Sequence, residues 1–188
     1  MFDTIRKYWK RINPAYHGII FFVIALFASN YFWAFTVSGD KNEDSLAVSF
    51  LGMDISAVFR WAILWFTNAV HCLLDFLGTG HLYVNSIIGF EDGHSMRVVA
   101  GCTAIKQFFI AFCILAFSRG PWLHKLWYIP CAIVILVGFN IFRLTVLAYV
   151  VRGCAEWFDF FHLYVMKYMF YATILVLWYI WDEYLRFW

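Results

Sequence analysis

Four stretches of this 188-residue chain are apolar over about the length that a helix needs to cross a lipid bilayer. They cover residues 18–39, 98–118, 126–142 and 160–181. Hydrophobic residues make up 64% of the chain and charged residues only 14%, and a chain of this size cannot bury so much apolar surface in one water-facing globule. The composition excludes an ordinary soluble enzyme, a disordered chain and a nucleic-acid binder. It predicts an all-α, polytopic transmembrane helical bundle folded as a single domain over residues 1–188.

A fifth apolar segment, residues 57–77, carries a polar stripe. Arg60, Asn68, His71 and Asp75 follow one another at spacings of 8, 3 and 4, which places them on one face of a helix. Either this stripe faces the protein interior, or the helix lies at the membrane interface.

Residues 81–101, which follow this segment, are rich in residues that favour strands. Gly89 and the pair Asp92-Gly93 lie between the two halves of the stretch. We therefore expect a short β-hairpin over the outer face of the bundle.

The positions of the basic residues predict how the chain is oriented. Four of them precede the first span (Arg6, Lys7, Lys10 and Arg11) and place the N-terminus in the cytoplasm. The span itself is expected to be a retained anchor rather than a signal peptide. The basic turn at residues 119–125 is expected inside, so that the C-terminus is cytoplasmic too. For consistency, residues 57–77 must form a non-crossing or re-entrant helix on the outer side.

The cysteines and histidines give no sign of a cofactor. The five cysteines are an odd number without CxxC spacing, which argues against a zinc site and against a disulfide framework. The histidines other than His162 are scattered over different segments, without a pair spaced like the axial ligands of a haem. We expect neither a cofactor nor a metal site.

Arg143 lies inside an apolar helix, where a charge is costly, and Asn140 lies one turn before it on the same face. Either Arg143 snorkels to the interface, or the pair belongs to an interior polar site. Cys102 begins the most apolar part of residues 98–118. Lys106, one helical turn later, would share its face and favour the thiolate, unless Cys102 is an ordinary buried cysteine.

His162 begins the last span, with Asp159 one turn earlier. A histidine beside a carboxylate is oriented and kept basic, although an interfacial histidine with a loop aspartate would give the same pattern. In the predicted topology, Cys102, Arg143 and His162 all come to the outer ends of their helices. Such a trio can supply a nucleophile, a stabilising cation and a general base.

These residues in this order, Cys102, then Asn140-Ile-Phe-Arg143, then His162, resemble the exosortase/archaeosortase family over about residues 96–181. Further similarity to its short, core-only members lies in Gly101-Cys102, Gly120-Pro121-Trp122, Lys125-Leu126-Trp127 and Pro130. The family commonly has a small polar residue and then glycine after the cysteine, whereas this chain has Thr103-Ala104.

The resemblance implies a membrane-embedded cysteine protease or transpeptidase of the bacterial cytoplasmic membrane, with its site facing outward. It would cleave a C-terminal sorting signal of membrane-anchored exported proteins. Cys102 would be the nucleophile, His162 the base and Arg143 the group that stabilises the thiol or the developing oxyanion. Asn140, Asp159 and Lys106 would support them.

The sequence also allows two other interpretations of the function. One is a small transporter or membrane assembly subunit that binds an anion through Arg143 and Lys106. The other is a catalytically degenerate member of the same family. The sequence does not specify the oligomeric state.

Overall fold

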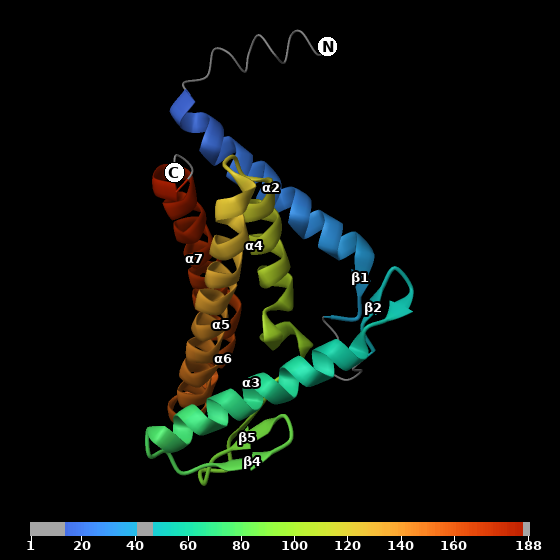
Figure 1. The fold of residues 1–188 in the computed structure, drawn as a ribbon. Coiled ribbons are helices and arrows are strands. Elements are labelled where there is room, and N and C mark those ends of the chain that lie inside the picture. Colours follow the sequence, from blue (N-terminus) through green and yellow to red (C-terminus); the bar gives the residue numbers. More distant parts are fainter. Residues whose placement is uncertain (1–13, 41–46, 186–188) are drawn as a thin grey trace.

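The computed structural model describes residues 14–40 and 47–185, and helices dominate this part of the chain (Figure 1). The main helices are α2 (Pro14–Thr36), α3 (Ser56–Phe76), α4 (Ile105–Phe117), α5 (Trp122–Gly153) and α7 (Met166–Ile180). Before α7 come a 3₁₀ turn η2 (Ala155–Trp157), the short α6 (Phe158–Phe160) and a π-helical turn η3 (Phe161–Val165), and a second π-helical turn η4 (Trp181–Leu185) follows it. The predicted all-α polytopic bundle is confirmed.

Four helical segments of the described chain are long and apolar enough to cross a membrane. They are His17–Thr36, Ser56–Phe76, Trp122–Gly153 and Ala155–Leu185. Three of them contain or overlap the predicted spans at 18–39, 126–142 and 160–181. Helices are favoured there because hydrocarbon offers no partner to a backbone N–H or C=O, which must be hydrogen-bonded within the segment.

The structure does not form one continuous helix over the predicted span at residues 98–118. Helix α4 covers only Ile105–Phe117, 13 residues, which at 1.5 Å per residue is about 20 Å, short of the ~30 Å hydrocarbon core. The residues before it form a 3₁₀ turn, η1 (Ala100–Thr103), and Ala104 separates the two with a left-handed backbone at φ 58°. Hydropathy does not detect this break, because residues 98–105 are all small or apolar.

Helix α3 runs across one end of the group formed by α4, α5 and α7 rather than beside these helices (Figure 1). Its buried face is largely apolar and includes Phe59, Phe66 and Leu74. Arg60, Asn68 and Asp75 of the polar stripe are exposed, and so are Trp61 and Trp65. Of the two arrangements that the sequence allowed, the stripe therefore faces outward. This is the arrangement of a helix that lies along an interface.

Two small antiparallel sheets flank α3. The sequence predicted a hairpin at residues 81–101, and the structure has three strands there: β4 (Leu82–Val84), β5 (Ile87–Gly89) and β6 (Ser95–Arg97). A salt bridge of 3.8 Å between Asp92 and Arg152 connects the β5–β6 turn to the end of α5. The second sheet was not predicted; its strands β1 (Val37–Ser38), β2 (Ser49–Phe50) and β3 (Met53–Asp54) precede α3.

The opposite end of the bundle holds the start of α2, the α4–α5 turn and the end of α7 (Figure 1). The ammonium of Lys125 donates to the carbonyls of Ala116 and Ser118, which satisfies carbonyls at the end of α4 that lack helical partners. The indole of Trp181 donates to the carbonyl of Arg119 at 2.9 Å. The basic turn, the start of α2 and the end of α7 therefore lie together, away from both sheets. The cytoplasmic location of this end of the bundle stays a prediction.

The described chain has two apolar cores. One lies within the bundle, where α2, α4, α5 and α7 enclose side chains such as Ile110, Leu136 and Phe170. The other lies beneath α3 and the β4–β6 sheet and includes Phe66, Leu144 and Cys102. Cys102 is therefore held at the junction between the bundle and the elements that cover its end.

Candidate active site

Cys102 lies in the 3₁₀ turn η1 and is 7% exposed. Its own N–H donates to the carbonyl of Val99 at 2.9 Å. The hydroxyl of Thr103 donates to the carbonyl of Ala100 at 2.7 Å. The small polar residue after the cysteine thus closes the turn locally, and the thiol is carried by a short, internally bonded loop.

The break at Ala104 changes the expected surroundings of the thiol. Because α4 begins only at Ile105, Cys102 does not occupy the first turn of that helix, as the sequence reasoning assumed. The argument that Lys106 shares a helix face with Cys102 fails for the same reason. Ala104 has the left-handed backbone that glycine adopts without strain. This position is the one where the resemblance leads one to expect glycine.

Asn140 and Arg143, one turn apart on α5, are both buried, at 0% and 6% exposure. The amide Nδ2 of Asn140 donates to the carbonyl of Cys102 at 3.1 Å, and Nη1 of Arg143 donates to Oδ1 of Asn140 at 3.5 Å. The Nε of Arg143 has no hydrogen-bond partner in the described residues. Asn140 and Arg143, which the sequence placed on one helix face, thus form a buried series of hydrogen bonds that ends at the cysteine loop.

His162 lies in the π-helical turn η3, a rare geometry that often occurs at functional sites. Its ring stacks on that of Phe158, with centroids 5.4 Å apart and an angle of 12° between the planes. Phe158 thereby fixes the plane of the imidazole from the previous helical turn. The sequence reasoning assigned this orienting role to Asp159 and did not consider Phe158.

A cavity of about 620 Å³ brings several of these residues together. Cys102, Asp159 and His162 line it, with Phe158 and Leu163 beside the histidine. Arg143 and Asn140 do not line it; they lie behind the cysteine loop. Lys106, on α4, is half-buried and is also not part of the lining.

Among the cavity residues that sequence reasoning missed are two with titratable or charged side chains, His94 and Arg97, which reach it from the β6 region. Their only sequence signal is closeness to Cys102, since they precede it by eight and five residues. Arg97 is exposed and adds a positive charge to the same opening.

A separate group, His71, Asp75 and His81, has ligand atoms within 4.8 Å of one another, so the histidines are less scattered than the sequence suggested.

Comparison with known proteins gives one assignment. The family model described as transmembrane exosortase matches residues 45–179. This range covers most of the chain and includes Cys102, Asn140, Arg143 and His162. Neither the search of the curated proteins nor that of the solved structures gave a match. Together with the apolar spanning helices, the match over residues 45–179 means that this chain belongs to the transmembrane exosortase family and is an integral membrane protein.

Proposed function

We propose that this protein is a membrane-embedded cysteine protease or transpeptidase that cleaves the C-terminal sorting signal of membrane-anchored exported proteins. The observation that carries the proposal is that the thiol-bearing Cys102 and the imidazole of His162 line one cavity. A guanidinium, that of Arg143, is buried directly behind the cysteine loop. A nucleophile, a base and a cation on three separate segments suit acyl transfer better than anion binding.

In the proposed reaction the Cys102 thiol transfers its proton to the imidazole of His162. The thiolate sulfur then attacks the scissile carbonyl carbon and forms a tetrahedral adduct. When the C–N bond breaks, the imidazolium returns the proton to the leaving amine, and an acyl-thioester remains on Cys102. Water or an acceptor nucleophile then attacks the thioester and restores the thiol, which gives hydrolysis or transfer respectively.

Arg143 has an electrostatic role in this proposal. Because it lies behind the loop and does not line the cavity, it acts on the sulfur rather than on distant parts of the substrate. Its positive charge, buried in an apolar cluster, would stabilise negative charge that develops on the sulfur more strongly than an exposed charge would. Asn140 is a positioning residue, since it bonds both to the carbonyl of Cys102 and to Arg143.

The cavity also suits the substrate that the family implies. Its lining combines apolar side chains, such as Met96 and Leu163, with the polar His94 and Arg97. A volume of about 620 Å³ is within the range of sites that hold a few residues of a peptide. A substrate with an apolar anchor helix could lie beside the bundle and present its signal at this end.

Processing of a co-produced substrate tests the proposal. We expect Cys102→Ala to abolish cleavage of a membrane-anchored protein with a C-terminal sorting signal, and Cys102→Ser to retain little. Cys113→Ala is the matched control, because Cys113 is half-buried on α4 and does not line the cavity. The substrate would be sought among proteins encoded nearby that end in a short motif, one apolar helix and a basic tail. Full processing by Cys102→Ala would refute the proposed chemistry.

We further propose that the cavity faces away from the cytoplasm, in a bacterial cytoplasmic membrane, with both chain ends inside. Cys154 is exposed and follows α5 directly, next to Ala155 of the cavity lining. A variant that retains Cys154 and has alanine at the other four cysteines should react with a membrane-impermeant thiol reagent in intact cells. Reaction only in inverted vesicles would reverse this orientation.

A further inference from the structure

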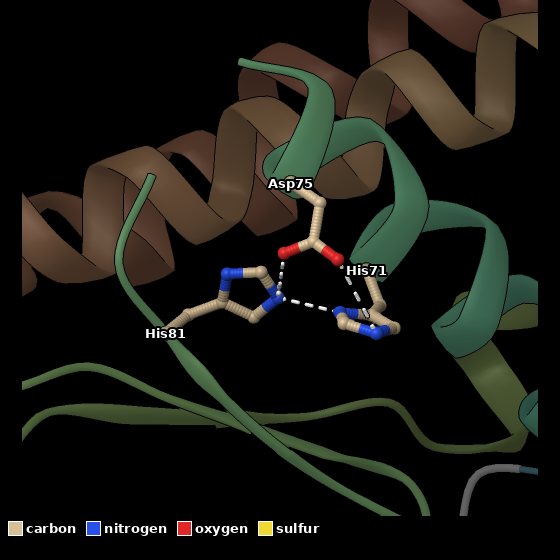
Figure 2. A group of neighbouring side chains, drawn as sticks. All are labelled: His71, Asp75 and His81. Carbon is tan, nitrogen blue, oxygen red and sulfur yellow. Dashed lines mark hydrogen bonds and ion pairs between the residues drawn. The ribbon is translucent and has the colours of Figure 1, made fainter. Parts of the chain in front are cut away.

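Two histidines and an aspartate converge at the C-terminal end of α3, outside the proposed active site. His71 and Asp75 lie one turn apart on the same face of α3, and His81 comes from the segment that enters β4 (Figure 2). The turn between them reverses the chain. Gly78 has φ 70°, its N–H donates to the carbonyl of Asp75, and the N–H of Thr79 donates to that of Leu74. This left-handed helix end brings His81 back against the last turn of α3.

The three side chains lie close enough together to share one cation, since their ligand atoms are within 4.8 Å of one another. Nδ1 of His71 and Nε2 of His81 are 2.7 Å apart. Oδ1 of Asp75 is 3.8 Å from Nε2 of His81, and Oδ2 is 3.5 Å from Nε2 of His71. At this distance one ring donates an N–H to the lone pair of the other. A metal ion could replace the shared proton if the rings moved apart, and the carboxylate beside them would favour its positive charge.

The orientation of His81 is fixed by a group behind it. Nδ1 of His81 lies 2.7 Å from the carbonyl oxygen of Thr79, which can only accept, so Nδ1 carries a proton. Neutral His81 therefore directs the lone pair of Nε2 toward His71 and Asp75. Metal-binding histidines typically donate their other ring N–H to a carbonyl or carboxylate in this way. The hydroxyl of Thr79 is in turn 2.6 Å from that of Tyr149 on α5, which connects this support to the bundle.

We propose that His71, Asp75 and His81 form a binding site for a divalent transition metal ion, with Zn²⁺ the best match. Two imidazoles and one carboxylate are ligands that Zn²⁺ accepts, and three protein ligands leave a fourth tetrahedral position for water. Zinc–nitrogen bonds of ~2.0–2.1 Å place tetrahedral ligand atoms about 3.3 Å apart. The observed 2.7 Å and 3.8 Å lie on either side of that separation, so shifts of roughly half an ångström would bring these two pairs of atoms to it.

The ion would connect α3 to β4 and thus brace the sheet that carries part of the cavity wall. His81 supplies an interior ligand, since its side chain is 1% exposed, whereas that of Asp75 is 61% exposed and gives an ion access from outside. The inference is independent of the proposed peptidase chemistry, because none of the three ligands lines the cavity.

Metal binding by the purified protein in detergent tests the proposal. The protein would carry an affinity tag without histidine, be stripped with a chelator and be titrated with Zn²⁺ against a chromophoric competitor. We expect one Zn²⁺ per chain and a higher melting temperature with the metal, because an ion that binds only the folded state stabilises it. Asp75→Asn should weaken binding at least about tenfold, and it should leave folding intact because Asp75 is exposed. His81→Gln should abolish binding.

Two controls separate this site from others. His124→Gln alters a half-buried histidine on α5 and should bind Zn²⁺ like the wild type. Cys102→Ala should do the same, and bound Co²⁺ should give visible d–d bands without thiolate charge transfer. The proposal is overturned if the wild type binds no Zn²⁺ at micromolar concentration, or if Asp75→Asn binds it as tightly as the wild type. Loss of binding in Cys102→Ala would also overturn it, by moving the metal to the thiol.

Discussion

Removal of the Asn140 side chain is the sharpest test of how the cysteine loop is held. Asn140 is fully buried and links α5 to this loop: it donates to the carbonyl of Cys102 at 3.1 Å and accepts from Arg143 at 3.5 Å. Asn140→Ala leaves a buried carbonyl without this partner, which costs about 1–3 kcal/mol. The substitution also removes the long hydrogen bond that the buried guanidinium of Arg143 donates to Asn140. We add about 1 kcal/mol to the cost for this loss. We therefore expect a loss of about 3 kcal/mol in the free energy of unfolding.

For a chain of 188 residues, 1 kcal/mol shifts the melting temperature by about 2–4 °C. Asn140→Ala should therefore melt about 6–12 °C below the wild type in the same detergent, followed by tryptophan fluorescence. Asn68→Ala is the matched control, because Asn68 is exposed on α3, and it should melt within about 2 °C of the wild type. If Asn140→Ala behaves like this control, Asn140 does not hold the cysteine loop and the reasoning fails.

Three further predictions concern other positions. Arg143→Lys should reduce substrate processing at least about tenfold, because a point charge replaces a planar guanidinium; near-normal turnover would make Arg143 a structural residue. Ala104→Val should lower stability by about 2–4 kcal/mol, since a β-branched residue is strained at φ 58° and the site is 1% exposed, whereas Ala104→Gly should change the melting temperature little. Hydrogen bonds from the Ser56 side chain and backbone lower the pKa of the Asp54 carboxyl below 3.8 in the folded protein. The ionised Asp54 carboxyl therefore stabilises the folded protein fully above pH 3.8, the ordinary pKa of the group. This stabilisation is lost as the pH falls through the lower pKa that the carboxyl has in the folded protein. Asp54→Ala should melt below the wild type at neutral pH, and the gap should narrow as the pH falls below the folded-state pKa of Asp54; a pH-independent gap would contradict this.

The candidate site was accessible to sequence reasoning only as a set of residue types. Arg143 and Asn140 could be paired because both belong to one helix with a known period. That Cys102 and His162 line the same cavity could not be derived, since they lie on segments 60 residues apart. Phe158 escaped notice because an aromatic residue in an apolar span carries no signal of its own. Its role depends on the π-helical turn that brings its ring onto that of His162.

The cluster at the end of α3 shows the same limit. His71 and Asp75 share a helix face at a spacing of four, which the sequence makes plain. His81 joins them only because the chain reverses at Gly78. The periodicity of a helix does not extend through such a turn.

The sequence by itself determined that this chain is a helical membrane protein, because uncharged apolar runs of this length can satisfy their backbone in lipid only as helices. Only the tertiary structure decided those features of the fold that hydropathy does not predict. It made α4 begin only at Ile105, after the left-handed Ala104, although the residues before it are just as apolar. It also turned the polar stripe of α3 outward, a choice that periodicity leaves open because a helix has the same amphipathic pattern whichever face is buried.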